Sequence, residues 1–238
     1  MTVPVRRLEF ADAREAADLG AFLARLIHYD RAAAVRLQAG GGGGGAVAVF
    51  GRPASFEVLA IRTARLAAPY APGVLDVTVS AGELLESLDE TAGAATVPGA
   101  VTGPPWAGVL PPRGGWRQVP GLPGETEIRR ALALSVAEFR ARDERLTPDT
   151  RTRAERDRIG REIWSRTLGD TGLPLRAVHA AQSLGFLRPV RATVAAPAGP
   201  PEQPWALFAS GGWLRLRTPY GSIAVRRAGL GALTVTPA

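Results

Sequence analysis

One segment, residues 93–124, limits the folds open to this chain more than any other feature. It contains Gly103-Pro104-Pro105-Trp106 and Pro111-Pro112-Arg113-Gly114-Gly115-Trp116. Proline fixes φ and removes a backbone donor, so such a stretch favours neither a helix nor a central strand. Disordered linkers seldom carry large aromatic side chains. We therefore expect a linker or an ordered loop, which Trp106 and Trp116 anchor onto a neighbouring surface.

The hydrophobic pattern of residues 1–92 predicts an α+β lobe. Apolar residues recur at three- and four-residue spacing over residues 11–28, which is the spacing of one helix face. Ser80 and Glu83 have the spacing of a capping box and predict a short helix that ends near Glu90. Alternation or short apolar runs indicate four strands, over residues 32–38, 46–50, 56–66 and 74–79.

The pattern of residues 125–238 predicts a second lobe, with three helices followed by antiparallel strands. The helices are expected over residues 125–146, 148–168 and 174–187, with Thr147 as the cap of the second. The strands are expected over residues 205–209, 213–218, 222–227 and 232–236. The whole chain is thus expected to be an α+β protein of two lobes that the loop over residues 93–124 joins.

The last clear turn signal, Thr218-Pro219-Tyr220-Gly221, predicts a β-hairpin. A two-residue loop places Arg217 opposite Ser222 and Leu214 opposite Val225. This register gathers apolar side chains on one face, namely Leu214, Leu216, Ile223 and Val225. It places one tryptophan and three arginines on the opposite face, namely Trp213, Arg215, Arg217 and Arg226. A slip of one residue mixes the two sets. The pattern therefore predicts a cationic sheet face, flanked by an aromatic ring and open to solvent.

The residue types that the chain lacks restrict its chemistry. The sequence contains neither lysine nor cysteine. Covalent catalysis by a lysine amine or a cysteine thiolate is therefore excluded, apart from the N-terminal amine. His28 and His179 are the two histidines, and neither has the spacing of a metal-binding motif. The glycine run Gly40–Gly45 lacks both the lysine and the following helix of a phosphate loop. We expect no metal and no cofactor.

The basic charge of the chain has two interpretations. All twenty-nine basic side chains are arginines, and the formal net charge is +7. GC-rich coding produces such a bias, and a partner such as nucleic acid or anionic lipid requires one. The same alternative applies to Arg151–Arg166, which predicts either an exposed helix laced by ion pairs or a helix that contacts phosphates. No apolar run has the roughly 18 residues of a membrane span, and no signal peptide is evident, so a cytoplasmic location is expected.

Several phrases of the sequence resemble those of one group of proteins. They are Phe56–Arg62, Pro104–Trp106, Pro111–Trp116 and Trp213–Ser222. The resemblance is to proteins of unknown function from high-GC actinobacteria, and it runs along most of the chain. It implies a cytoplasmic bacterial protein and carries no catalytic residue across.

Three functions are compatible with these patterns. The first is a non-catalytic binding or interaction role, in which Trp213, Arg215, Arg217 and Arg226 contact an anionic ligand, a nucleic acid or a protein partner. The second is a winged-helix-like DNA-binding protein, with the helix over residues 174–187 as recognition helix and the hairpin as wing. The third is an enzyme that uses carboxylate chemistry at the lobe interface, near Trp106 and Trp116.

Overall fold

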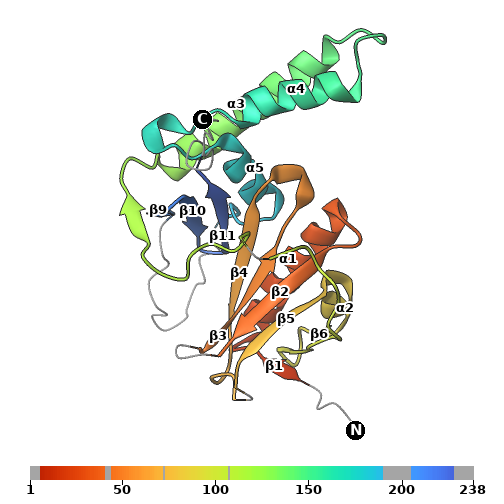
Figure 1. Cartoon of the computed structure of the whole chain (residues 1–238), viewed down its shortest axis with the longest axis vertical. Helices are drawn as coiled ribbons and strands as arrows, with labels where there is room; N and C mark the ends of the chain where they lie inside the picture. The colour runs from red at the N-terminus through yellow and green to blue at the C-terminus, as the bar shows by residue number, and fades with distance from the viewer. Residues whose placement is uncertain (1–5, 41–43, 72, 107, 190–204, 228–238) are drawn as a thin grey trace, which may run out of the picture.

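The computed structural model describes residues 6–40, 44–71, 73–106, 108–189 and 205–227 (Figure 1). Its centre is an eight-stranded antiparallel sheet of order β5-β2-β3-β4-β11-β10-β9-β8. Four strands come from the first part of the chain: β2 (Ala34–Ala39), β3 (Ala46–Gly51), β4 (Leu59–Arg65) and β5 (Leu75–Ser80). The other four are β8 (Arg117–Val119), β9 (Ala206–Ser210), β10 (Trp213–Thr218) and β11 (Gly221–Arg226).

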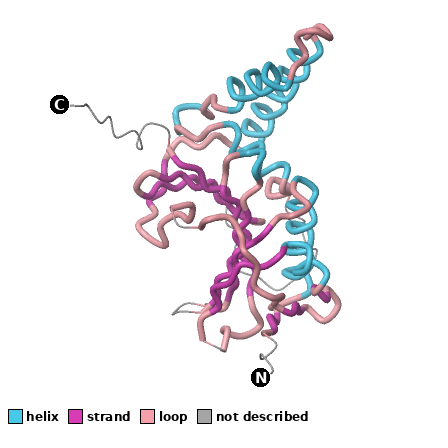
Figure 2. Tube along the Cα trace, turned by 45° about the vertical axis from the view of Figure 1, so that its right-hand side comes forward, coloured by secondary structure: helices cyan, strands magenta, loops and turns pink. Residues whose placement is uncertain are grey.

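Five α-helices and a smaller sheet complete the described elements. The helices are α1 (Ala13–Tyr29), α2 (Ala81–Glu86), α3 (Glu125–Glu144), α4 (Arg153–Trp164) and α5 (Leu175–Ser183), with short 3-10 turns η1 (Ala54–Phe56) and η2 (Gly169–Thr171). The small sheet has the order β1-β7-β6, from β1 (Arg7–Glu9), β7 (Ala94–Thr96) and β6 (Leu88–Asp89). The helices lie along one side of the large sheet, and α3 and α4 project beyond it as a helical hairpin (Figure 2).

The predicted α+β class is confirmed, and the strands of the two predicted lobes meet in one sheet. Strand β11 pairs with β4, so that Ser222 lies opposite Ile61 and Ala224 opposite Leu59. The hairpin near the end of the chain therefore lies inside the sheet. Local sequence patterns do not report this pairing, because the two strands are far apart in the chain.

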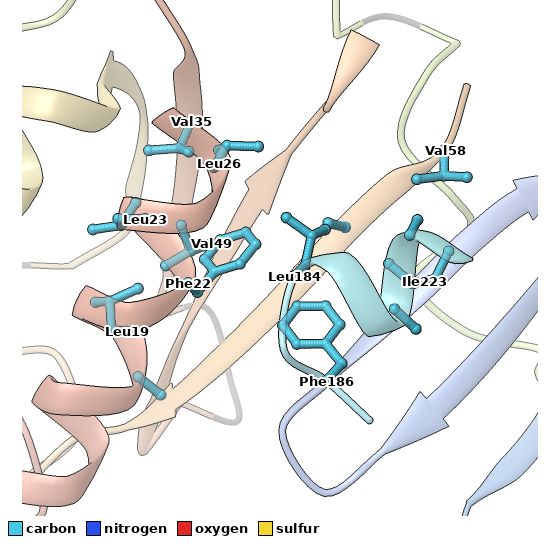
Figure 3. Packing of buried hydrophobic residues seen from close by; sticks show 14 of the residues in the cluster. Leu19, Phe22, Leu23, Leu26, Val35, Val49, Val58, Leu184, Phe186 and Ile223 are labelled. Atoms are coloured by element: carbon cyan, nitrogen blue, oxygen red, sulfur yellow. The ribbon is translucent and has the colours of Figure 1, made fainter. Parts of the chain in front are cut away.

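The core between α1, α5 and the sheet is shown in Figure 3. Helix α1 begins after Asp12, whose side chain accepts a hydrogen bond from the Glu15 amide. Its buried stripe includes Phe22, and the ring of Phe22 stacks on that of Phe186 at 5.5 Å between centroids. Each such side chain contributes roughly 1.5–3 kcal/mol when it leaves water. This core fixes the side of the sheet on which the helices lie.

Several predicted boundaries in the first half of the chain are wrong. The strand expected from residue 56 begins at Leu59, because η1 runs to Phe56 and the next residue, Glu57, is left-handed with φ of 51°. Helix α2 has the predicted Ser80 cap but ends at Glu86, because β6 follows directly. The predicted loop contains two short strands, β7 and β8, and β7 is the middle strand of the small sheet. Proline does not prevent this, because β7 is Ala94-Ala95-Thr96.

Helix boundaries in the second half also differ from the prediction. Helix α3 ends at Glu144 instead of residue 146, and α4 ends at Trp164 instead of residue 168. Helix α4 begins at Arg153 instead of Pro148, because the hydroxyl of Thr152, not Thr147, accepts a hydrogen bond from the Glu155 amide at 3.2 Å. Helix α5 ends at Ser183, just before Gly185, whose φ of 77° stops a helix. The strand expected over residues 232–236 lies outside the described residues.

Candidate functional site

The register predicted for the terminal hairpin is confirmed. Arg217 lies opposite Ser222 and Leu214 opposite Val225. Leu214 and Leu216 are buried against the helices, with exposed fractions of 1% and 0%. On the opposite face, Arg215 and Arg217 are half-buried and Arg226 is exposed. We call these three side chains the arginine face.

Trp213 has a different environment from the one expected. Its exposed fraction is 8%, and it packs in a second apolar cluster on the face of the sheet away from α1 and α5, with Leu59, Ile61, Trp106 and Ala224. Trp106 is also buried, and its indole Nε1 donates a hydrogen bond of 3.0 Å to the Thr78 hydroxyl. Trp213 therefore does not offer an open stacking surface, because the Trp106 loop and strand β4 cover it.

Each of the three guanidinium groups of the arginine face contacts an aromatic ring. The guanidinium carbon of Arg217 lies 4.6 Å from the ring centroid of Phe208, and that of Arg226 lies 4.7 Å from the ring of Trp213. Arg215 lies 5.9 Å from the ring of Trp116. Such cation–π contacts hold a guanidinium group in place without neutralising its charge. Sequence reasoning missed Phe208, although strand pairing places it directly opposite Arg215.

The arginine face lacks acidic partners within the described part of the chain. No carboxylate described there lies within 4.0 Å of the guanidinium nitrogens of Arg215, Arg217 or Arg226, and Arg226 donates a hydrogen bond to the Gly108 carbonyl. The Nε atoms of Arg215 and Arg217 are buried and have no hydrogen-bond partner among those residues. Burial, followed by the charge of Arg217, lowers the pKa of Arg215. A bound anion would offset the repulsion between these two positive charges.

Arg36 lies on the same face of the sheet but, unlike Arg215 and Arg217, has an acidic partner among the described residues. Arg36 contacts Asp76 through two hydrogen bonds of 2.6 and 2.8 Å. The hydrogen bond to Arg36, followed by the Coulomb attraction of the same side chain, lowers the pKa of Asp76 against the opposing effect of burial. The Arg36 charge is therefore neutralised within the protein. The charges of Arg215 and Arg217 are not neutralised by any described residue.

The comparisons with known families divide the chain near the Trp106 loop. Residues 3–108 match the domain of unknown function DUF8010, and residues 111–230 match the domain of unknown function DUF8185. The second match spans half of the chain. The chain belongs to the DUF8185 family. No curated protein and no solved structure gives a significant match. The DUF8185 region contains the arginine face and Phe208, and the DUF8010 region contributes Trp106 and the neighbouring strand β4.

The hairpin of the DUF8185 region does not have the geometry of a wing. Strand β11 pairs with β4 as well as with β10, so the hairpin is an internal part of the sheet. Helix α5, the candidate recognition helix, buries most of its side chains in the core, namely Leu175, Ala177, Val178, Ala180 and Ala181. A recognition helix must present side chains to the major groove. This arrangement does not favour the winged-helix alternative.

Ion pairs account for most of the arginines of α4. Arg158 contacts Glu155 at 2.6 Å, and Arg166, just after the end of α4, contacts Glu138 on α3 at 2.6 Å. A spacing of four residues predicts the pairs Glu162–Arg166 and Asp157–Arg161. The first is present at 3.3 Å, whereas Asp157 contacts Arg153 rather than Arg161. The interpretation of this segment as a helix laced by ion pairs is therefore confirmed.

Neither histidine forms a catalytic pair with a described carboxylate. Asp30, two residues after His28 in the sequence, accepts a hydrogen bond from the Ala32 amide. The imidazole of His179 stacks on Trp164 at 4.2 Å between centroids, and burial lowers the pKa of His179. Across the residues that the structure describes, no three potential ligands cluster as a metal site. Within the same residues, no helix is long and apolar enough to cross a membrane.

Proposed function

We propose that this chain is a non-catalytic binding protein that takes an anionic ligand on its arginine face. The observation that carries the proposal is the pair Arg215 and Arg217, two half-buried cations without a described acidic partner. They lie two residues apart on one strand face, which corresponds to about 7 Å. Two positive charges at this spacing repel one another, and a shared anion would stabilise both.

The surroundings of the two guanidinium groups favour a compact phosphate or carboxylate group. A guanidinium group donates hydrogen bonds to such an anion in a bidentate geometry. The rings of Phe208 and Trp116 already contact Arg217 and Arg215, so the face of each ring that meets its arginine is not available for a base to stack upon. Single-stranded nucleic acid would need such open rings. The contacts therefore support an anionic group more than a nucleobase.

An enzyme near the Trp106 loop has less support. Asp76 is a carboxylate on this side of the sheet, and the bidentate contact with Arg36 occupies it. A general base needs a carboxylate that can take up a proton near neutral pH, whereas the pKa of Asp76 is lowered. We also propose that the protein is bacterial and cytoplasmic. The resemblance of its sequence to actinobacterial proteins supports this.

Retention on a phosphate-bearing resin tests the proposal. The triple variant Arg215→Gln, Arg217→Gln and Arg226→Gln should elute at a clearly lower salt concentration than the unmodified protein, because the phosphate contacts are lost. A matched triple variant changes exposed arginines elsewhere, at Arg14, Arg31 and Arg52. It removes the same charge and should elute close to the unmodified protein. Equal shifts in both variants would show that net charge alone causes retention.

A further inference from the structure

A row of aromatic rings crosses the helical side of the molecule. Tyr29 at the end of α1 meets Phe56 edge-on at 5.2 Å, and Phe56 meets His179 edge-on at 5.2 Å. His179 stacks on Trp164 at 4.2 Å, and Trp164 lies 6.2 Å from Phe139 on α3. These contacts join α1, η1, α5, α4 and α3. The last three rings are only half-buried, so they keep a face for a further contact.

The half-buried end of this row lines a pocket between α3, α4 and α5. The pocket has a volume of about 440 Å³, which lies in the range of small-molecule sites. Its apolar lining consists of Val136, Phe139, Trp164 and His179. Its charged lining consists of Arg140, Asp143, Glu144, Arg151 and Arg156. The pocket thus has aromatic side chains on one side and charged side chains, here called the charged rim, on the other.

The charged rim carries an excess of one positive charge. Asp143 contacts both Arg151 and Arg156, at 2.8 and 2.9 Å. Glu144 adds the second negative charge, and Arg140 adds the third positive charge. Arg140 is exposed and has no ion pair with a residue in the described ranges. Burial lowers the pKa of His179 and so favours the uncharged imidazole.

From these contacts we propose that the pocket binds a small planar aromatic molecule that carries one carboxylate, sulfonate or phosphate group. Its ring packs against Trp164 and Phe139, and its anionic group contacts Arg140. Ring stacking and a charge-assisted hydrogen bond together give orientation as well as affinity. This site is separate from the arginine face, because its lining comes from α3, α4, α5 and the loop between α3 and α4, and not from the large sheet.

Fluorescence titration with 1-anilinonaphthalene-8-sulfonate, whose planar naphthalene ring carries one sulfonate group, tests the proposal. The unmodified protein should bind the probe with 1:1 stoichiometry. Arg140→Gln should weaken binding about tenfold, because one charge-assisted contact is lost. Arg161→Gln is the matched control, since Arg161 is exposed on α4 and outside the pocket lining. It should bind as the unmodified protein does.

Two further measurements separate this pocket from other sites. Trp164→Leu should weaken binding of the probe, with circular dichroism as the check that the helices remain. The double variant Arg215→Gln and Arg217→Gln should bind the probe normally, because the arginine face is a different site. Unchanged binding by Arg140→Gln, or no saturable binding by the unmodified protein, would overturn the proposal and leave the ring row as packing between helices.

Discussion

Arg62 donates a hydrogen bond of 2.9 Å from Nη2 to Oε2 of Glu15, and this contact ties the middle of β4 to α1. The same guanidinium donates from Nη1 to the carbonyl of Tyr220 at 3.1 Å, in the turn before β11. Only 5% of Arg62 is exposed. One buried side chain thus connects the first helix, a central strand and the hairpin that carries the arginine face.

Removal of Arg62 should destabilise the fold strongly. Arg62→Ala leaves Glu15 half-satisfied and opens a cavity, and breaking a buried ion pair costs about 3–5 kcal/mol. We expect a loss at the lower end of that range, because Arg65 also contacts Glu15 at 2.8 Å. Arg62→Met should cost less, since it refills the space. Urea unfolding measures both values, and an unchanged midpoint for Arg62→Ala would contradict the structural role.

The two loop tryptophans should differ in their contribution to stability. Trp106 is buried and bonded to Thr78, so Trp106→Ala should lower the free energy of unfolding by about 3–5 kcal/mol. Trp116 is half-buried, and its indole donates only to the Pro112 carbonyl within the same loop. Trp116→Ala should therefore cost about 1 kcal/mol. Thermal unfolding of the two variants checks the order, and equal losses would contradict it.

Acid should weaken the contact between α3 and α4. Arg142 lowers the pKa of Glu162 to about 2, first through its hydrogen bonds and then through Coulomb attraction. Arg166 adds smaller effects of the same two kinds. An unfolded glutamate titrates near 4.5, so this stabilisation is present above that pH and is lost as pH falls toward 2. The melting temperature should fall over this interval. Glu162→Gln should flatten that dependence, and an equally steep fall in the variant would argue against these ion pairs as its source.

The terminal hairpin could be predicted because the turn residues and the alternation of side chains indicated the same strand register. The turn residues set the loop length, and only one register separates leucines from arginines. The neighbours of the hairpin could not be predicted in this way. Ser222 pairs with Ile61, and this contact depends on the packing of the whole sheet rather than on the adjacent sequence. Trp213 was expected to be exposed for the same reason, since the chain that covers it is remote in sequence.

The pocket between α3, α4 and α5 also could not be predicted from the sequence. His179 follows an inward residue of α5, and that position alone marks it as a boundary residue. Its stack on Trp164 requires that α4 folds back beside α5, which no short motif reports. The pair of Glu162 and Arg166 was predictable, because a spacing of four residues brings the charges together. The pair of Arg166 with Glu138 was not, because it crosses to α3.

The central claim is that Arg215 and Arg217 form an anion site, and calorimetric titration with inorganic tripolyphosphate tests it most directly. The unmodified protein should bind with 1:1 stoichiometry, and the double variant Arg215→Gln and Arg217→Gln should bind at least tenfold more weakly. The control variant Arg14→Gln and Arg31→Gln, which removes the same charge, should keep the affinity of the unmodified protein. Equal affinity in the Arg215 and Arg217 variant would contradict the claim.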